Sequence, residues 1–286
     1  MFTSVSRREA IRRVTAALVV VFGTPARGEE WSEGAGPQRD EQSPETSQPQ
    51  NKEAGSGPSR PQPAETPQTA PVCKVTAQSV EGPFYFDPKL VRTDITEAEQ
   101  GSPLDIALSV IDAATCLPVA NARVDVWHAN ASGHYSGFAN QGDQSDISTE
   151  GKTFLRGTQV TSSDGTVQFL SIYPGWYKGR APHVHVKVLL EEKLLVTAQI
   201  YFPEILTQRI YGEHEPYNAR GGPETANAQD AIFAAAGGGD GQIIAGISAI
   251  GDTITASLTL AVDKTAAPVS GQKRGFWYYL HELIWK

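Results

Sequence analysis

Two histidines one residue apart are the residues of this sequence best suited to hold a metal ion. His183 and His185 lie within residues 180–188, where valine takes the alternate positions from Val184. Successive side chains of a strand point to opposite faces, so a strand here places both imidazoles on one face and the valines on the other. Neutral imidazole is a common metal ligand, and paired histidines are also ordinary strand residues. The motif alone leaves both interpretations open.

Two tyrosines stand in turns upstream of the histidines. Tyr177 follows a Pro-Gly pair at residues 174–175, and this turn presents its phenol within reach of the imidazoles. Tyr135 lies in the segment 127–137, where a strand runs into a glycine-bounded turn. These turns add oxygen donors to the histidine motif.

These segments together resemble a known family. Residues 127–137, the Ser-Asp-Gly turn at 163–165, the turn at 174–177 and the Arg-x-Pro-His-x-His run at 180–185 are similar to the intradiol ring-cleavage dioxygenases, the group of protocatechuate 3,4-dioxygenase and catechol 1,2-dioxygenase. Their order and spacing match over residues 79 to about 236. The flanking runs 81–85 and 217–230 look like the exported, single-chain branch of that family.

The resemblance implies a mononuclear non-haem Fe(III) site with four protein ligands, namely Tyr135, Tyr177, His183 and His185. It implies that Tyr177 is the axial ligand, opposite His185. The resemblance further implies that the substrate displaces Tyr177 and that Tyr177 takes one of the substrate's protons. A neighbouring arginine, Arg180, is expected to stabilise charge on the bound ring. The implied reaction cleaves a catechol-type ring with O₂ to give a muconate-type diacid.

The chemistry of this ligand set agrees with a ferric ion. Tyrosine has an ordinary pKa of about 10, and a trivalent cation supplies the charge that deprotonates it. Two phenolates and a bound hydroxide then neutralise Fe(III). The rival set of two histidines and one carboxylate is typical of Fe(II).

Other aromatic and histidine residues are weaker candidates. Tyr85, Tyr173 and Trp176 are expected to wall the substrate pocket, although such residues are often only packed. His128 and His134 flank Tyr135, and we expect exposed positions at a strand end for both.

Two alternative functions fit the same segments. Residues 110–124 and 163–169 also resemble transthyretin-like sandwich modules that only bind ligands, and fold alone does not separate these from enzymes. A zinc hydrolase would combine the histidines with a carboxylate and a water molecule. Convergence of two tyrosines with both histidines would favour the dioxygenase. The sequence does not favour catechol, hydroxyquinol or protocatechuate over the others as the substrate.

The elements that must position these residues are mainly strands. With 27 Gly and 19 Pro among 286 residues, the chain is rich in turns. Period-two alternation predicts an all-β fold, an antiparallel β-sandwich with long loops and at most one or two short helices. The expected strands are 104–111, 124–127, 166–170, 181–190, 194–202 and 253–262, and a short helix is expected over 227–236.

Charge and cysteine content limit the partners and the compartment. A net charge of −8 excludes a nucleic-acid partner that requires a basic surface. Cys73 and Cys116 are the only cysteines, and export would favour a disulfide between them over two buried thiols.

The ends of the chain predict its destination. Residues 1–28 look like a twin-arginine export signal, with an ordinary secretion signal as the alternative, and the apolar run 14–23 is too short for a transmembrane span. We therefore expect a periplasmic or extracellular protein. Residues 29–72 are expected to form a disordered Pro/Gln/Glu-rich linker, and residues 73–265 are expected to form the catalytic domain. The aromatic extension 266–286 is expected to dock on its own domain, with homodimer formation or a membrane-surface contact as alternatives.

Overall fold

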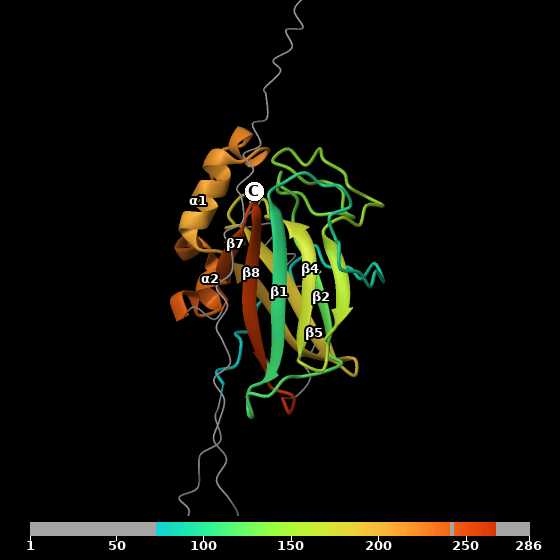
Figure 1. Cartoon of the computed structure of the whole chain (residues 1–286). Helices are drawn as coiled ribbons and strands as arrows, with labels where there is room; N and C mark the ends of the chain where they lie inside the picture. Colours follow the sequence, from blue (N-terminus) through green and yellow to red (C-terminus); the bar gives the residue numbers. More distant parts are fainter. Residues whose placement is uncertain (1–72, 241–242, 267–286) are drawn as a thin grey trace, which may run out of the picture. The chain divides into compact units, whose positions relative to one another are not determined.

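The computed structural model describes residues 73–240 and 243–266. The expected export signal (1–28), the linker (29–72) and the C-terminal extension from residue 267 lie outside the described residues. Two sheets of four strands each face one another in the described part, as Figure 1 shows. The first sheet has the order β4-β1-β8-β7 and the second the order β3-β2-β5-β6.

The strands have the following bounds: β1 Pro103–Asp112, β2 Arg123–Trp127, β3 Arg156–Val160, β4 Thr166–Ile172, β5 His183–Leu190, β6 Lys193–Tyr201, β7 Gly246–Ile250 and β8 Thr253–Val262. The helices are α1 Glu204–Glu213 and α2 Ala231–Ala235, with 3₁₀ turns η1 Tyr217–Ala219, η2 Asn227–Gln229 and η3 Gly238–Asp240.

Alternation along the strands builds one core between the sheets. Both sheets contribute every second side chain to it, from β1 Leu104, Ile106, Leu108 and Val110, and from β5 Val184, Val186 and Val188. The all-β sandwich expected from the sequence is therefore confirmed. The valines of β5 face the core, which leaves the histidines of the same strand on the outer face of the second sheet.

One strand pair departs from the antiparallel expectation. β8 lies parallel to β1, with Leu104 opposite Ile254 and Asp112 opposite Val262, whereas the other strand pairs of the two sheets are antiparallel. A parallel pair needs a long connection, and here most of the domain lies between the two strands. Alternation within a strand carries no information on its direction.

The helical segments differ from expectation in two ways. Helix α1 was not expected, and among its residues only Thr207, Ile210 and Tyr211 are buried. The expected helix over 227–236 is interrupted at Asp230, which has an extended backbone and whose carboxylate accepts the amide hydrogens of Ile232 and Phe233 at the start of α2. No helix among the described residues is long and apolar enough to cross a membrane.

Residues 73–102 run across the sandwich and tie its strands together. Cys73 and Cys116 form the expected disulfide, which closes a loop with a sequence separation of 43. Further on, Thr76 donates to Ala261 of β8 at 2.9 Å and Ser79 to Thr197 of β6 at 2.7 Å. This segment brings Phe84 and Tyr85 to the second sheet.

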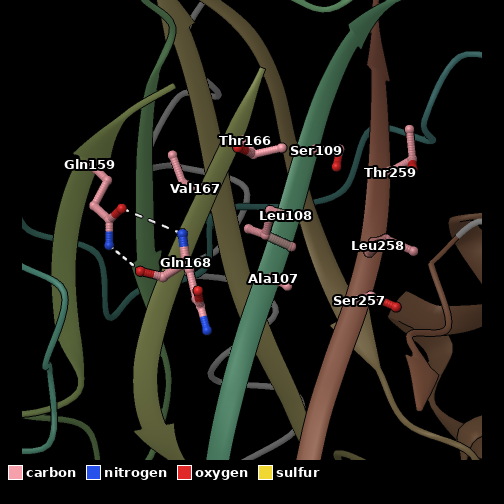
Figure 2. A pocket seen from close by; sticks show the side chains of 10 residues that line it. All are labelled: Ala107, Leu108, Ser109, Gln159, Thr166, Val167, Gln168, Ser257, Leu258 and Thr259. Atoms are coloured by element: carbon pink, nitrogen blue, oxygen red, sulfur yellow. Dashed lines mark hydrogen bonds between the residues drawn. The ribbon is translucent and has the colours of Figure 1, made fainter. Parts of the chain in front are cut away.

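The outer face of the first sheet carries a shallow hollow of about 420 Å³ (Figure 2). Serine, threonine, glutamine and small apolar residues line it, including Ser109, Gln168 and Thr259. Its lining contains no histidine, tyrosine or charged side chain. Groups that could donate or accept protons in catalysis, or hold a metal, must therefore be sought elsewhere.

Candidate metal centre

Strand β5 places both histidines among aromatic and polar side chains of its neighbours. His183 pairs with Tyr201 of β6, and His185 pairs with Gln199 of β6 on one side and Trp127 of β2 on the other. The indole of Trp127 stacks on the imidazole of His185, with ring centres 4.7 Å apart and an interplanar angle of 11°. Stacking and strand pairing fix the orientation of His185.

The two tyrosines reach this face from separate loops. Tyr135 lies between β2 and β3, and Tyr177 lies between β4 and β5. Tyr135 Oη is 3.0 Å from His185 Nε2, 3.3 Å from His183 Nε2 and 3.5 Å from Tyr177 Oη. His183 Nε2 is 3.3 Å from Tyr177 Oη and 3.1 Å from His185 Nε2. The four residues singled out in the sequence thus bring four donor atoms to one point.

These separations match atoms that share a metal ion. Donor atoms about 2.0–2.1 Å from one ion lie about 2.9 Å apart at 90° and about 3.5 Å apart at 120°. The five distances span 3.0 to 3.5 Å, which is this range. Among the described residues, Tyr177 and His185 are the one pair of the four without a hydrogen-bonding contact. The donor set of two phenols and two imidazoles is a set that fits a ferric ion.

Hydrogen bonding directs a lone pair of His183 to this point. His183 Nδ1 donates to the carbonyl oxygen of Ala181 at 2.7 Å, so its Nε2 carries the free lone pair. Burial, together with the charge of Arg180, lowers the pKa of both imidazoles well below the ordinary value. Burial also raises the pKa of the Tyr135 phenol well above its ordinary value. A cation would reverse the effect on the phenol, because it favours the charged form.

Tyr135 is held firmly in its loop. Its backbone N–H donates to Gln141 Oε1 at 2.7 Å, and Gln141 Nε2 donates back to the Tyr135 carbonyl at 2.8 Å. The hydroxyl of Thr149 donates to the same carbonyl. The ring of Phe84 stacks on the ring of Tyr135 at 4.6 Å. The phenol therefore has little freedom to leave the histidines.

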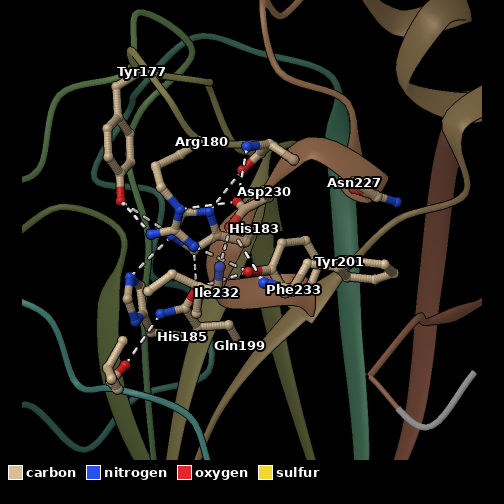
Figure 3. Close-up of polar contacts among 12 residues, drawn as sticks. Tyr177, Arg180, His183, His185, Gln199, Tyr201, Asn227, Asp230, Ile232 and Phe233 are labelled. Carbon is tan, nitrogen blue, oxygen red and sulfur yellow. Dashed lines mark hydrogen bonds and ion pairs between the residues drawn. The ribbon is translucent and has the colours of Figure 1, made fainter. Parts of the chain in front are cut away.

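Arg180 lies next to Tyr177 in a buried polar network (Figure 3). Its Nη1 donates to Tyr177 Oη at 3.2 Å, and its Nη2 donates to Gln199 Oε1 and, at 3.0 Å, to Tyr201 Oη. Its Nε donates to the carboxylate of Asp230 at 2.9 Å. The guanidinium can therefore stabilise negative charge at Tyr177 Oη and at a group bound beside it.

None of the three expected pocket residues lines the cavity beside Tyr177. Tyr173 is fully buried in the core, where its hydroxyl pairs with Thr207 Oγ1 at 2.7 Å. Tyr85 packs on Trp127, and its hydroxyl donates to Asp125 at 2.8 Å. Trp176 is nearly buried, with Arg220 over its ring at 3.9 Å. Each of the three side chains packs against, or hydrogen-bonds to, another residue of the domain. The sequence alone does not show which partner lies next to each of them.

The neighbouring histidines also differ from expectation. His128 is fully buried, donates from Nδ1 to the carbonyl of Ala129 at 2.8 Å and accepts from Ser171 Oγ at 2.7 Å. Burial lowers its pKa to about 4. His134 is half-buried and lines the pocket beside Tyr177. The strand end that carries both histidines is covered by loops, so neither has the exposed position expected for it.

A cavity of about 610 Å³ adjoins Tyr177. Phe84 and Tyr177 supply its aromatic wall, and polar or charged groups supply the rest, among them His134, Asp143 and Lys178. A ring that enters here meets the side chain of Tyr177. The sequence had pointed to Tyr85 as a wall residue, whereas its neighbour Phe84 has this position.

Four further residues support the centre, although the sequence analysis named none of them as a site residue. Gln199 and Asp230 belong to the Arg180 network, and Phe84 stacks on Tyr135. Arg156 is buried next to the Tyr135 loop, where its Nε donates to Ser136 Oγ at 2.8 Å. Gln199 could have been found as a polar residue next to the apolar residues of its strand.

Comparison with known proteins finds similarity to dioxygenases. A sequence model described as "Dioxygenase" matches residues 80–207. An intradiol ring-cleavage dioxygenase from Tetranychus urticae is 30% identical, with a TM-score of 0.62 over 70% of this chain and 98% of that protein. Catechol 1,2-dioxygenase 1 from Acinetobacter lwoffii is 36% identical over 107 residues, which are 36% of this chain and 32% of that enzyme. Chlorocatechol 1,2-dioxygenase from Rhodococcus opacus is 28% identical over 50% of this chain and 58% of that enzyme.

The fold and the donor set define a class, a β-sandwich with two phenols and two imidazoles gathered on the outer face of one sheet. The match along nearly the whole length of the mite protein specifies the family. The chain belongs to the intradiol ring-cleavage dioxygenases. It spans about a third to three-fifths of the length of the two bacterial enzymes.

Proposed function

We propose that this protein is an intradiol dioxygenase that holds one non-haem Fe(III) and cleaves a catechol-type ring between its two hydroxylated carbons. The observation that carries the proposal is the convergence of Tyr135, Tyr177, His183 and His185, whose donor atoms lie 3.0 to 3.5 Å apart. Both atoms of O₂ enter the product, a muconate-type diacid, and no other reductant or oxidant is needed.

The four residues are the proposed iron ligands. The ferric ion, when bound, supplies the positive charge that lowers the pKa of both phenols and of a bound catechol and primes the ring for reaction with O₂.

The protein's own groups then handle a proton and a charge. Tyr177 lines the cavity, so its hydroxyl can take a proton from an incoming diol hydroxyl. The Arg180 guanidinium, 3.2 Å from that oxygen, stabilises the charge that develops on the substrate oxygen. The ring of Phe84 stacks on the ring of Tyr135, covers the Tyr135 phenol and keeps water from it.

The substrate is a small aromatic diol. The cavity of about 610 Å³ is larger than a catechol ring, and its polar outer wall can solvate substituents. The names of the bacterial relatives, which act on catechol and chlorocatechol, support a catechol-type substrate.

Oxygen uptake with product analysis tests the proposal. The iron-loaded protein should consume one O₂ per catechol and place both labelled oxygen atoms in a ring-opened diacid. Tyr135→Phe should abolish the reaction. Tyr217→Phe is the matched control, because Tyr217 is also a buried tyrosine but donates to the Tyr173 carbonyl in the core. Iron-loaded protein that consumes no oxygen with any catechol would contradict the proposal, and so would protein that binds zinc but no iron at this centre.

We also propose that the protein is exported. The disulfide between Cys73 and Cys116 supports an oxidising compartment. A reporter fused to residues 1–30 should leave the cytoplasm only in cells with a functional twin-arginine pathway. Export in cells that lack this pathway would overturn the assignment of the signal.

A further inference from the structure

Asp230 is a buried carboxylate that lies outside the segment matched by the family's sequence model, which ends at residue 207. Its side chain is fully buried, and it stands between the 3₁₀ turn η2 and helix α2. Figure 3 shows it beside Arg180 on the side away from Tyr177. A buried carboxylate is costly unless it is paired, so its partners indicate what it does.

The two oxygens of Asp230 have different partners. Oδ1 accepts from the backbone N–H groups of Ile232 at 2.8 Å and Phe233 at 3.2 Å and so caps α2. Oδ2 accepts from Arg180 Nε at 2.9 Å and from the Ala181 N–H at 3.1 Å. One oxygen therefore anchors the carboxylate in the fold, and the other points to the metal centre.

The Oδ2 contacts lead to two of the proposed ligands. Through Arg180, whose Nη1 donates to Tyr177 Oη, the carboxylate sets the position of the guanidinium beside that phenol. Through Ala181, whose carbonyl accepts from His183 Nδ1 at 2.7 Å, it fixes the backbone that selects the tautomer of His183. Asp230 is also the one carboxylate that pairs with Arg180 among the described residues.

We propose that Asp230 is a positioning residue of the metal centre, which holds Tyr177 and His183 in their ligating positions through Arg180 and Ala181. This inference rests on the proposed function. It assigns the segment between β6 and β7, including the start of α2, a role in metal binding.

Zn²⁺ titration of the metal-free protein by calorimetry tests the inference, because it needs no oxygenase activity. Asp230→Ala removes all four hydrogen bonds and should weaken Zn²⁺ binding at least tenfold. Asp230→Asn keeps one oxygen, which serves either α2 or Arg180, and should give an intermediate loss. Ala234→Gly is the matched control: it destabilises the exposed side of α2, leaves Arg180 untouched, and should bind Zn²⁺ within twofold of the wild type.

A spectroscopic readout separates positioning from stability. In the iron-loaded protein, Asp230→Asn should shift the tyrosinate charge-transfer absorption, and Ala234→Gly should not. The inference is overturned if folded Asp230→Ala and Asp230→Asn both bind Zn²⁺ within twofold of the wild type, or if Ala234→Gly weakens binding equally. If Asp230→Ala does not fold, the Asn variant decides. If the weakening occurs but no variant or wild type consumes oxygen with catechols, the proposed function fails while the positioning role stands.

Discussion

Gly175 lets the two loops that carry the tyrosines approach each other, and replacing it should separate them. An added Cβ would lie 2.6 Å from Gly133 N and 2.8 Å from Ala131 C, and closer still to the Asn130 carbonyl oxygen. These are backbone atoms of the Tyr135 loop, and ordinary contact begins at 3.4 Å. The loops must therefore part by about 0.8 Å or more, which exceeds the tolerance of about 0.5 Å for a binding constellation.

The expected result of Gly175→Ala follows from this displacement. Tyr177 Oη, which is 3.5 Å from Tyr135 Oη in the wild type, should move away from the other ligands. We expect metal affinity to fall about tenfold or more and the free energy of unfolding to fall by about 1–3 kcal/mol, the usual cost of overpacking. Calorimetric Zn²⁺ titration and urea denaturation of the metal-free protein measure the two quantities.

A matched glycine supplies the control. Gly212 lies in α1, is exposed, and a Cβ there would meet no atom within 4 Å. Gly212→Ala should leave metal affinity unchanged and should stabilise the helix by up to about 1 kcal/mol. The reasoning is refuted if Gly175→Ala binds Zn²⁺ as the wild type does, or if both substitutions lower the affinity by the same factor.

Two further predictions concern stability. His128 has a folded pKa of about 4 against about 6.5 when unfolded, so the unfolded chain binds more protons in between and stability is lost as the pH falls from 6.5 to 4. Between pH 6.5 and 4, the free energy of unfolding from urea denaturation should therefore fall by about 3 kcal/mol less in metal-free His128→Gln than in the metal-free wild type. An equal fall in both proteins would contradict this prediction. Replacing both Cys73 and Cys116 by Ala opens a loop with a separation of 43 residues and should lower the free energy of unfolding by about 4 kcal/mol, with an unchanged denaturation midpoint as the contrary result.

The strands that carry the site could be predicted because their alternation is regular. The expected strand over 253–262 has the bounds of β8, and those over 181–190 and 194–202 match β5 and β6 within two residues. Strand β3 was not predicted, because Arg156 and Gly157 occupy buried positions that usually hold apolar residues. The edge strand β7 has little alternation and is mostly exposed.

The candidate ligands could be named from the sequence because the short motifs around them resemble those of a known family. Asp230 could not be named in this way, because it is 50 positions from its partner Arg180. The path of the chain between the two residues depends on α1 and η2. The neighbours Phe84 and Tyr85 show the same limit. Both are aromatic, and only the fold of the extended segment decides that Phe84 stacks on Tyr135 while Tyr85 turns to Asp125.

A crystal structure of the iron-loaded protein with anomalous data collected at the iron edge tests the central claim most directly. The account predicts one anomalous peak per chain, at about 2 Å from Tyr135 Oη, Tyr177 Oη, His183 Nε2 and His185 Nε2. A peak bound by carboxylates elsewhere on the domain would contradict it. So would a metal held by the two histidines with both phenols turned away.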